Sequence, residues 1–403
     1  MILTLLAQAA LLLGPQDPGV DASEFTVLKA AKVYTADEAG MINNGMVVIQ
    51  NDKIVWVGEA KGVEVADGVE IQDLGQVWLV PGLIEPHNHV AGSLRDLNDT
   101  VFLTNPELHT YEVLEPQNPY LKDAVAGGVT SALFIPGSGS NMGGFGMLVK
   151  TSGKTPDEMV VRSPGSLKVA QSGNPERYSW GVRRAMMNWN TRNTLREGLE
   201  WAAAYEAGEA DFDPRYQDFV GLRNGTVPVS VHTQIYQVVL ETLTMQVQEL
   251  GLKSFVDHGT FDGYKVAPLA AELGVPVMNG PRQFWFDRST SQIMGCAAGW
   301  DSAEGIILGY NTDSPVIPQE ELPFQAAMGV RLGAGDAESA LRGMTANAAK
   351  ALLMEDIAGR LVEGLEADLV AWTGDPVDPR SSVLKVWVRG EKVYDVEEDQ
   401  RRF

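Results

Sequence analysis

Short apolar segments alternate with helical patterns from Val77 to Leu353, and this alternation restricts the fold more than any other feature of the chain. Alternation of this kind is typical of parallel βα units. The region is close to the roughly 250 residues that a closed (β/α)8 barrel uses. We therefore predict an α/β fold with such a barrel over residues 77–354. The expected strands are Val77–Ile84, Val129–Phe134, Gly165–Ala170, Val227–His232, Ser254–His258, Val275–Met278 and Ile306–Asp313, and the expected helices include Asn190–Ala207, Gln237–Leu250, Val266–Leu273 and Pro323–Leu332.

Both chain ends show a different pattern, in which short strand-like segments are separated by turns. Residues 23–76 contain segments such as Phe25–Ala30 and Lys53–Gly58, and residues 355–403 contain Ala367–Trp372 and Val383–Val388. Neither end has enough strands for a sandwich of its own. We therefore predict a small composite β-sandwich domain that both ends build together beside the barrel.

An apolar run, Ile2–Leu13, lies at the N-terminus and is interrupted by Gln8. It is too short for a bilayer span of about 20 residues, but its length fits the core of a signal peptide. No Lys or Arg precedes the run, so a disordered or mis-started N-terminus is the alternative. We expect a signal peptide and linker over residues 1–22 and export to the periplasm or the medium, with a cytoplasmic location under the alternative.

Acidic side chains strongly outnumber basic ones, with 53 Asp and Glu against 31 Lys and Arg and a net charge of −22. Such a surface repels phosphate backbones and anionic lipid, which argues against a nucleic-acid partner. Cys296 is the only cysteine, which excludes an intrachain disulfide and a cysteine-built zinc site. We expect the partner to be a small-molecule substrate. We expect no segment that spans a membrane, and the chain could form a homo-oligomer.

The five histidines are informative because four of them end predicted strands. His87 and His89 lie two apart at the end of a strongly apolar strand, so both project from one face. His232 alternates with the valines of its strand, which points it into the barrel. His258 ends the next strand, where the alternation is less clear, and Asp313 ends the last one. Barrel active sites lie at the carboxyl ends of the strands, so we predict that these five residues bind metal.

This set of ligands indicates the metal and its chemistry. Three or more imidazoles with a carboxylate suit Zn2+, with Fe, Mn or Ni as alternatives, and we expect one or two ions. A divalent metal polarises a carbonyl and lowers the pKa of its water. Asp313 could move the proton from water to the leaving group.

The chain carries the motifs Val80-Pro81-Gly82-Leu83-Ile84-Glu85-Pro86-His87-Asn88-His89, Asn311-Thr312-Asp313-Ser314-Pro315 and Gly364-Leu365-Glu366-Ala367-Asp368-Leu369-Val370, with His232 and His258 between them. In this order and spacing they resemble the amidohydrolase superfamily, in its imidazolonepropionase-like and prolidase-like branch. The resemblance implies a (β/α)8 barrel with a composite β-sandwich and hydrolysis of amide or related C–N bonds at one or two divalent metals. It also implies His87, His89, His232, His258 and Asp313 as ligands, with Asp313 as the proton shuttle. Under this resemblance His87 and His89 are expected at the more buried ion, and His232 and His258 would hold a second ion, or His232 would join the first pair in a single-metal site.

Binuclear members of this superfamily carry a bridging carboxylate on the fourth strand, either Glu or a carboxylated Lys. Lys168 alternates with Leu167 and Val169 on the corresponding strand, so we predict a carboxylated Lys168 as a metal ligand. A contact with a substrate carboxylate and a salt bridge are the alternatives. Ser172-Gly173-Asn174-Pro175 lacks the Glu that resembling sequences often carry, which keeps a single-metal site open. Glu85 stands where the family usually has Asp.

Other residues have weaker claims on function, and each also has an ordinary structural explanation. His109 could lie at the pocket rim or on the surface, and Arg183, Arg184 and Arg192 could bind a substrate carboxylate or point into solvent. Trp180, Trp189 and Trp285 could line the pocket or serve in packing, and the segment Asn279-Gly280-Pro281-Arg282 could contact the substrate. We expect the glycine-rich segment Pro136–Gly146 to form a flexible loop near the barrel mouth, and we expect Cys296 to be inert.

The sequence therefore favours a metal-dependent hydrolase that acts on amide-like carbon–nitrogen bonds, in a cyclic amide or a peptide-like substrate, through metal-activated water. One alternative is a single-metal deaminase of a cyclic amidine or an amino-substituted ring. A second is a barrel that binds partners without catalysis. A full set of ligands argues against the last, because a scaffold has no need of them.

Overall fold

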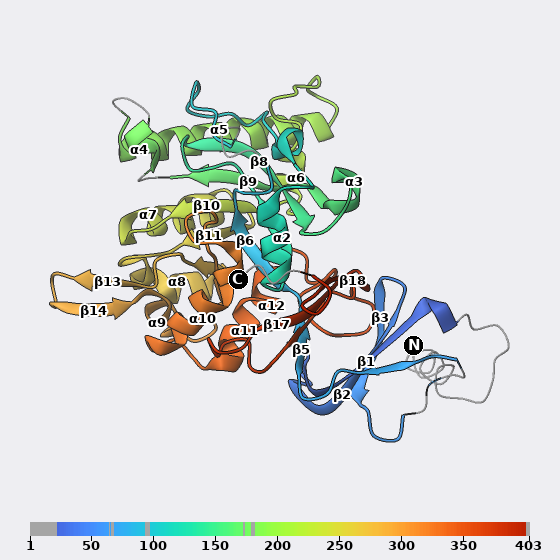
Figure 1. Cartoon of the computed structure of the whole chain (residues 1–403). Coiled ribbons are helices and arrows are strands. Elements are labelled where there is room, and N and C mark those ends of the chain that lie inside the picture. Colours follow the sequence, from blue (N-terminus) through green and yellow to red (C-terminus); the bar gives the residue numbers. More distant parts are fainter. Residues whose placement is uncertain are drawn as a thin grey trace.

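A computed structural model describes residues 22–63, 65, 68–92, 97–171, 174–178 and 182–399 (Figure 1). The expected signal peptide lies outside the described residues, apart from Ala22 at its end. Within the described residues, no helix is both long and apolar enough to cross a membrane. The larger part of the molecule is built around one sheet, and a second sheet lies beside it and contains the first described strands.

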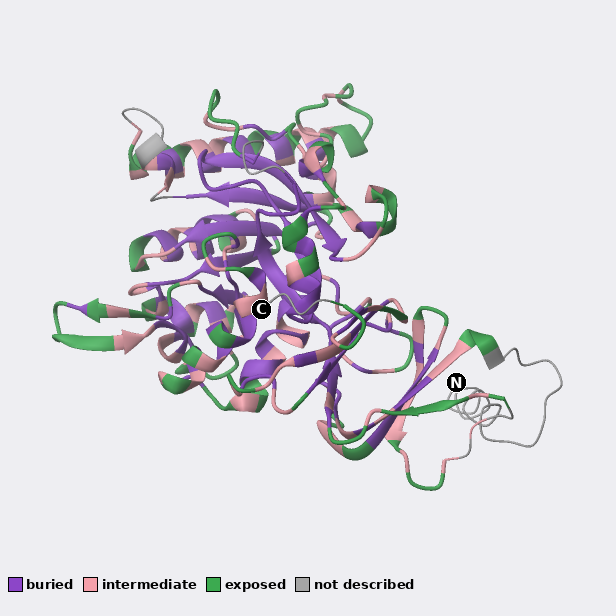
Figure 2. Ribbon diagram, in the orientation of Figure 1, coloured by how far each residue is buried: buried purple, intermediate pink, exposed green. Residues whose placement is uncertain are grey.

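The larger sheet is an eight-stranded barrel that positions the candidate site. Its order is β15-β12-β11-β10-β9-β8-β7-β6, and an isolated bridge between Asn88 of β6 and Ser314, which follows β15, nearly closes the sheet. These strands are almost wholly buried (Figure 2). Their bounds are β6 (Leu83–Asn88), β7 (Val129–Phe134), β8 (Met142–Lys150), β9 (Val160–Ala170), β10 (Val229–Thr233), β11 (Ser254–His258), β12 (Val277–Asn279) and β15 (Leu308–Tyr310). The predicted barrel is present, with one strand that differs from a regular (β/α)8 pattern.

That strand is β8, which runs antiparallel to both β7 and β9. Its first half belongs to the glycine-rich segment, so the prediction of a flexible loop over Pro136–Gly146 was wrong from Met142 onward. The glycines explain the difference, because a Cβ on Gly146 would lie 2.5 Å from the carbonyl oxygen of Phe134. A strand can pass this close to its neighbour only without side chains at such positions.

The predicted strand Val77–Ile84 is divided between the two sheets. Its first part is β5 (Trp78–Pro81), which pairs outside the barrel, and β6 begins at Leu83. Gly82 lies between them, where any Cβ would overlap the side chain of Thr130. The chain therefore passes from one sheet directly into the strand that carries His87 and His89.

The smaller sheet unites the two chain ends. Its order is β18-β17-β16-β5-β1-β2-β3, with β4 paired to β1, so the pairing is continuous from one end of the chain to the other. The bounds are β1 (Phe25–Tyr34), β2 (Met41–Gln50), β3 (Lys53–Glu59), β4 (Ile71–Asp73), β16 (Leu369–Trp372), β17 (Val383–Val388) and β18 (Glu391–Asp395). A separate hairpin of β13 (Phe284–Asp287) and β14 (Gln292–Gly295) projects from the barrel (Figure 1).

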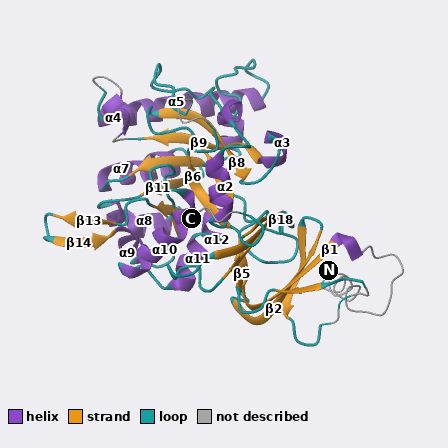
Figure 3. Ribbon diagram, in the orientation of Figure 1, coloured by secondary structure: helices purple, strands orange, loops and turns teal. Residues whose placement is uncertain are grey.

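Helices surround the barrel strands (Figure 3). The four predicted helices correspond to α5, α7 with the π-helix η3, α8 and α10, with shifted ends. The α-helices are α2 (Pro119–Ala126), α3 (Pro156–Met159), α4 (Asn174–Tyr178), α5 (Arg184–Glu206), α6 (Phe219–Arg223), α7 (Tyr236–Glu241), α8 (Ala267–Glu272), α9 (Cys296–Asp301), α10 (Leu322–Arg331), α11 (Ala337–Gly343) and α12 (Ala346–Ala351). The short helices are η1 (Ala22–Glu24), η2 (Thr110–Val113), η3 (Thr242–Glu249), η4 (Gly263–Val266) and η5 (Gln319–Glu321).

A buried cation joins the two sheets at β8. Lys150 is fully buried, and its Nζ lies 2.6 Å from Oδ2 of Asp368 and 2.7 Å from Oε2 of Glu366. The hydroxyl of Ser131 also accepts a hydrogen bond from Nζ, at 3.3 Å. Both carboxylates belong to the segment that leads into β16, so Lys150 ties the barrel to the sheet of the chain ends.

Candidate active site

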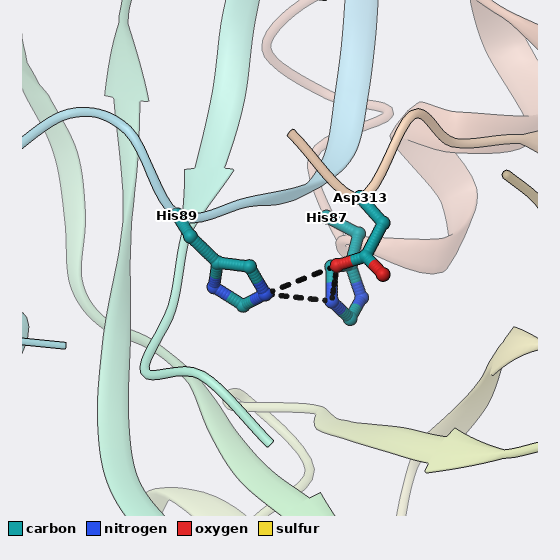
Figure 4. A group of neighbouring side chains, drawn as sticks. All are labelled: His87, His89 and Asp313. Atoms are coloured by element: carbon teal, nitrogen blue, oxygen red, sulfur yellow. Dashed lines mark hydrogen bonds and ion pairs between the residues drawn. The ribbon is translucent and has the colours of Figure 1, made fainter. Parts of the chain in front are cut away.

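Three of the predicted ligands meet at the carboxyl end of the barrel (Figure 4). Nε2 of His87 lies 3.1 Å from Nε2 of His89. Oδ1 of Asp313 lies 3.3 Å from the first of these atoms and 3.2 Å from the second. His87 and His89 come from the end of β6, and Asp313 follows β15, the neighbouring strand across the barrel closure. Three ligand atoms therefore face one point, although more than two hundred residues separate them in the chain.

His232 and His258 extend this cluster. The ring centroid of His258 lies 4.6 Å from that of His87 and 4.5 Å from that of His232. Each ring is held through Nδ1, that of His258 at 2.8 Å from the carbonyl oxygen of Gly280 and that of His232 at 3.0 Å from Oγ of Ser138. Nε2 of both rings is buried and makes no hydrogen bond within the described part of the chain. Such orphaned nitrogens are the atoms that a metal site requires.

Two of the predicted ligands enter the site through unusual backbone conformations. His258 has φ of 76° and Asp313 has φ of 52°, both in the left-handed region that non-glycine residues rarely adopt. Because side chains alternate along a strand, Asp257 would point into the barrel and His258 out of it. The left-handed backbone conformation at His258 instead turns its ring toward the cluster. Backbone strain of this kind concentrates at functional sites.

The side chain of Lys168 also lies in this cluster. It is fully buried, with Nζ 3.3 Å from Nε2 of His87 and 4.0 Å from Oδ2 of Asp257. Burial lowers the pKa of Lys168 to about 8, while Asp257 and Asp313 oppose this shift. About a tenth of the amine is therefore neutral at pH 7, far more than for an ordinary lysine.

Two buried acidic side chains support the cluster: Asp257, to which sequence reasoning assigned no role, and Glu85, which it marked only as standing where the family usually has Asp. Asp257 places Oδ2 3.0 Å from Nδ1 of His87 and accepts a hydrogen bond from the hydroxyl of Ser230. Glu85 accepts from the backbone N–H of His87 at 3.0 Å and from N–H and Oγ1 of Thr312 at 3.0 and 2.6 Å. Glu85 thus connects the His87 segment to the Asp313 segment. The sequence did offer one indication of Asp257, because the alternation of its strand places this acid on the inward face, next to a histidine at the strand end.

The charge states of these groups suit a divalent cation. Burial lowers the pKa of His258 to about 4 and that of His232 well below its ordinary value, so both rings are neutral at pH 7. Burial opposes ionisation of Asp313, but His258, His87 and His89 hold its pKa well below the usual range. Neutral His232 and His258 and an ionised Asp313 are ligand forms that bind Zn2+ and similar ions. Burial and Lys168 lower the pKa of His87, but Asp257 and Asp313 outweigh them and raise it, so this ring would release a proton on binding metal. The residues present therefore fit a metal site.

A cavity of about 430 Å³ reaches this cluster from outside. His89 and Asp313 line its wall, with Asn98, Thr100, Ser138 and Asn174 as neutral polar neighbours. Ser138 belongs to the glycine-rich segment before β8, so this segment both lines the cavity and holds His232. The cavity gives a small molecule access to the predicted ligands.

Most of the weaker candidates have structural partners. Nε2 of His109 lies 2.9 Å from Oδ2 of Asp218, and Arg192 pairs with Glu241 and Glu249 on the surface. Trp180, Ser172 and Gly173 lie outside the described residues. Arg183 donates a hydrogen bond to the carbonyl oxygen of Val182 and Arg184 donates one to the side chain of Gln237, while the side chain of Trp189 is exposed.

The remaining candidates also have ordinary contacts. Trp285 and Arg282 both pack against the ring of Phe261, and the side chain of Asn279 donates to the carbonyl oxygen of His258. Cys296 is buried, and burial raises the pKa of its thiol to about 11.

Gly280 offers a test of the packing behind the site. A Cβ at this position would overlap the backbone oxygen of Asn311, and the carbonyl of Gly280 holds the ring of His258. We expect Gly280→Ala to lower the free energy of unfolding by about 1–3 kcal/mol, as overpacking does. Turnover should fall as well, because the His258 and Asp313 segments are pushed apart. Denaturant unfolding and steady-state kinetics measure the two effects.

Gly274→Ala is the matched control, because Gly274 also has a positive φ but has open space around its Cβ position. Gly274→Ala should lower the free energy of unfolding only by the cost of a positive φ at a non-glycine residue, and it should leave turnover unchanged. Equal losses in both variants would show that backbone strain, and not the contact with Asn311, is responsible.

Comparison with known proteins finds similar sequences and similar folds among amidohydrolases. The model of the amidohydrolase family matches residues 286–393. Imidazolonepropionase of Cutibacterium acnes is 28% identical over 355 residues, which cover 83% of this chain and 85% of that protein. Amidohydrolase tasK of Hapsidospora irregularis is 25% identical, over 82% of this chain but only 38% of its own length. The crystal structure of an amidohydrolase from Thermotoga maritima superimposes with a TM-score of 0.82 at 27% identity, over 92% of this chain and 99% of the other.

The likeness thus extends over nearly the whole chain and includes the barrel and the sheet of the chain ends. The predicted motifs, the barrel and these matches agree with one another. The family match, the relatives and the solved structure indicate the amidohydrolase superfamily and, with it, a hydrolase that acts on carbon–nitrogen bonds.

Proposed function

We propose that this chain is a metal-dependent hydrolase that cleaves the amide-like bond of a small cyclic amide or peptide-like substrate. One observation carries the proposal: ligand nitrogens of His87 and His89 and a carboxylate oxygen of Asp313 lie within 3.3 Å of each other, with His258 and His232 beside them. The similarity to imidazolonepropionase supports a cyclic amide as the first substrate class to test.

The metal would be held by His87, His89 and Asp313, with His232 and His258 as the further ligands of one or two ions. A divalent metal, with Zn2+ the first choice for this set of donors, supplies polarisation of the scissile carbonyl and a lowered pKa for the attacking water. The protein fixes the donors beforehand, since Nδ1 of His89, His232 and His258 each lies within 3.0 Å of an oxygen atom.

Asp313 is the proposed proton carrier. Its carboxylate is held ionised by the surrounding histidines, so it can accept a proton at Oδ1 or Oδ2 when water attacks the carbonyl. The same group can then donate this proton to the departing nitrogen, which leaves as a neutral amine. Asp313 also lines the cavity, so its carboxylate is accessible to a bound substrate.

Lys168 decides between two forms of the site. As a carbamate, formed from its neutral amine and CO2 with release of a proton, it would supply an anionic bridge between two ions. As an ammonium it would repel a second cation, which leaves a single-metal site. Burial supports the first form, because it raises the fraction of neutral amine at Lys168.

The cavity also indicates how substrate is bound. Asn98, Thr100, Ser138 and Asn174 offer donors and acceptors to a polar, uncharged amide. Oδ1 of Asn98 accepts the N–H of Gly139 at 2.8 Å, which fixes the carboxamide against the glycine-rich turn. These groups suit orientation of an amide above Asp313.

Metal removal and a substrate panel test the proposal. We expect metal analysis to find one ion per chain, or two if Lys168 is carboxylated, and prolonged chelation to abolish turnover. Zn2+ or Mn2+ should restore it. The panel contains cyclic amides, dipeptides and N-acyl amino acids, with amine, acid and ammonia measured separately.

Each other outcome assigns a different function. Ammonia released from an aminated ring, with no cleavage of amides, would favour the single-metal deaminase. Less than about 0.2 metal per chain, with no turnover after Zn2+ or Mn2+ is added, would favour a binding protein and reject catalysis.

A further inference from the structure

Asp257, at the end of β11, presents a buried carboxylate to the far side of the His87 ring. Its Oδ2 lies 3.0 Å from Nδ1 of His87, while Nε2 of the same ring faces His89 and Asp313. The side chains of Asp257 and His87 are both fully buried. The carboxylate comes from the strand that carries His258. One strand therefore contributes both a predicted ligand and a residue that contacts another predicted ligand, His87.

The chemistry of the pair determines which nitrogen is free. An ionised carboxylate accepts hydrogen bonds and cannot donate them, so Asp257 favours the ring hydrogen on Nδ1. Asp313, on the Nε2 side, is itself a predicted metal ligand and would share that side of the ring with the metal. The lone pair then resides on Nε2, which faces the candidate metal position. A ring that carried its hydrogen on Nε2 could not bind metal there, and the ring of His87 would first have to exchange tautomers.

We propose that Asp257 is a positioning residue that keeps the His87 ring in the tautomer and orientation that metal binding requires. This inference rests on the proposed function, because it assumes that His87 binds metal. Outer carboxylates of this kind typically raise metal affinity by about 10- to 100-fold. Asp257 does not itself contact the cavity that leads to the site, within its described lining.

Ser230 supports this role and supplies a control. Its hydroxyl donates to the same Oδ2, from the neighbouring strand β10, and so limits rotation of the carboxylate. Ser230→Ala removes this restraint but leaves the negative charge in place. Asp257→Asn keeps the shape of the side chain but offers an NH2 group to Nδ1, which favours the wrong tautomer of His87.

Cobalt binding to the metal-free full-length chain tests the proposal. Metal-free wild type, Asp257→Asn and Ser230→Ala are titrated with Co2+ by calorimetry and by visible absorption, and each metal-free protein is melted in parallel. We expect Asp257→Asn to bind the first equivalent of Co2+ about 10- to 100-fold more weakly, with an altered visible spectrum. Ser230→Ala should lose less than about tenfold with a spectrum like that of wild type.

The outcomes separate this inference from the proposed function. Equal Co2+ affinity and spectra in wild type and Asp257→Asn would overturn the positioning role, even if the variant melted at a lower temperature, because a purely structural residue would give that result. Wild type that bound neither Co2+ nor Zn2+ would overturn the proposed function itself.

Discussion

Asp313→Asn should lower kcat by about 10²- to 10⁴-fold, the usual contribution of a positioned acid–base group. Asparagine keeps the size of the side chain but cannot accept and return a proton. It also removes the charge that lies 3.2 and 3.3 Å from Nε2 of His89 and His87. Steady-state kinetics on the best substrate of the panel, with metal content measured on the same sample, give the comparison.

Asp218→Asn is the matched control for this experiment. Asp218 and Asp313 have equally exposed side chains, at 19%, and each lies near a histidine, but Asp218 pairs with His109 outside the candidate metal site. It should retain kcat within about twofold of wild type, as for substitutions away from the reacting groups. Wild-type turnover in Asp313→Asn with full metal content would remove Asp313 from its proposed role.

Lys150→Met should destabilise the protein by about 3–5 kcal/mol, the cost of leaving a buried ion pair without one partner. Methionine fills most of the space of the lysine stem but leaves Asp368 without the cation at its Oδ2, and it leaves Glu366 with only the partly exposed Arg389, at 3.3 Å. The lost contacts join β8 to the segment before β16, so both sheets should be affected. Chemical denaturation followed by tryptophan fluorescence and by circular dichroism measures the loss.

Lys385→Met provides the comparison on the surface. Lys385 also pairs with a buried carboxylate, Asp395, at 2.7 Å, but its own side chain is 29% exposed and Lys392 binds the same oxygen. Its loss should cost no more than about 1 kcal/mol, as at exposed ion pairs. Similar losses in the two lysine variants would show that burial does not set the strength of the Lys150 contacts.

The sequence was sufficient to locate His87, His89, His232, His258 and Asp313 at strand ends, because apolar strands and their ends can be read from local pattern. The same reasoning gave an inward Lys168, which is buried beside His87. It also united the two chain ends in one β unit, since neither has enough strands alone. The roles of these histidines, Asp313 and Lys168 as metal ligands are predictions that a measurement of metal binding would test.

The remaining features depend on contacts between distant residues. The inward position of His258 follows from its φ of 76°, which no alternation of residue types reveals. Asp257 is notable only once His87 is placed opposite it. The strand β8 was missed because glycine-rich segments usually form loops, and only the close approach to Phe134 shows why glycines are required in this one.

The sheet of the chain ends also has a consequence for synthesis. In this sheet β5 pairs with β16, and β5 continues through Gly82 into the strand of His87 and His89. Since β16 leaves the ribosome long after β5, one edge of β5 stays without its final neighbour during most of translation. The candidate site can therefore reach its mature form only after the chain is nearly complete, and nascent fragments that already contain both histidines expose an open strand edge that can pair with other chains.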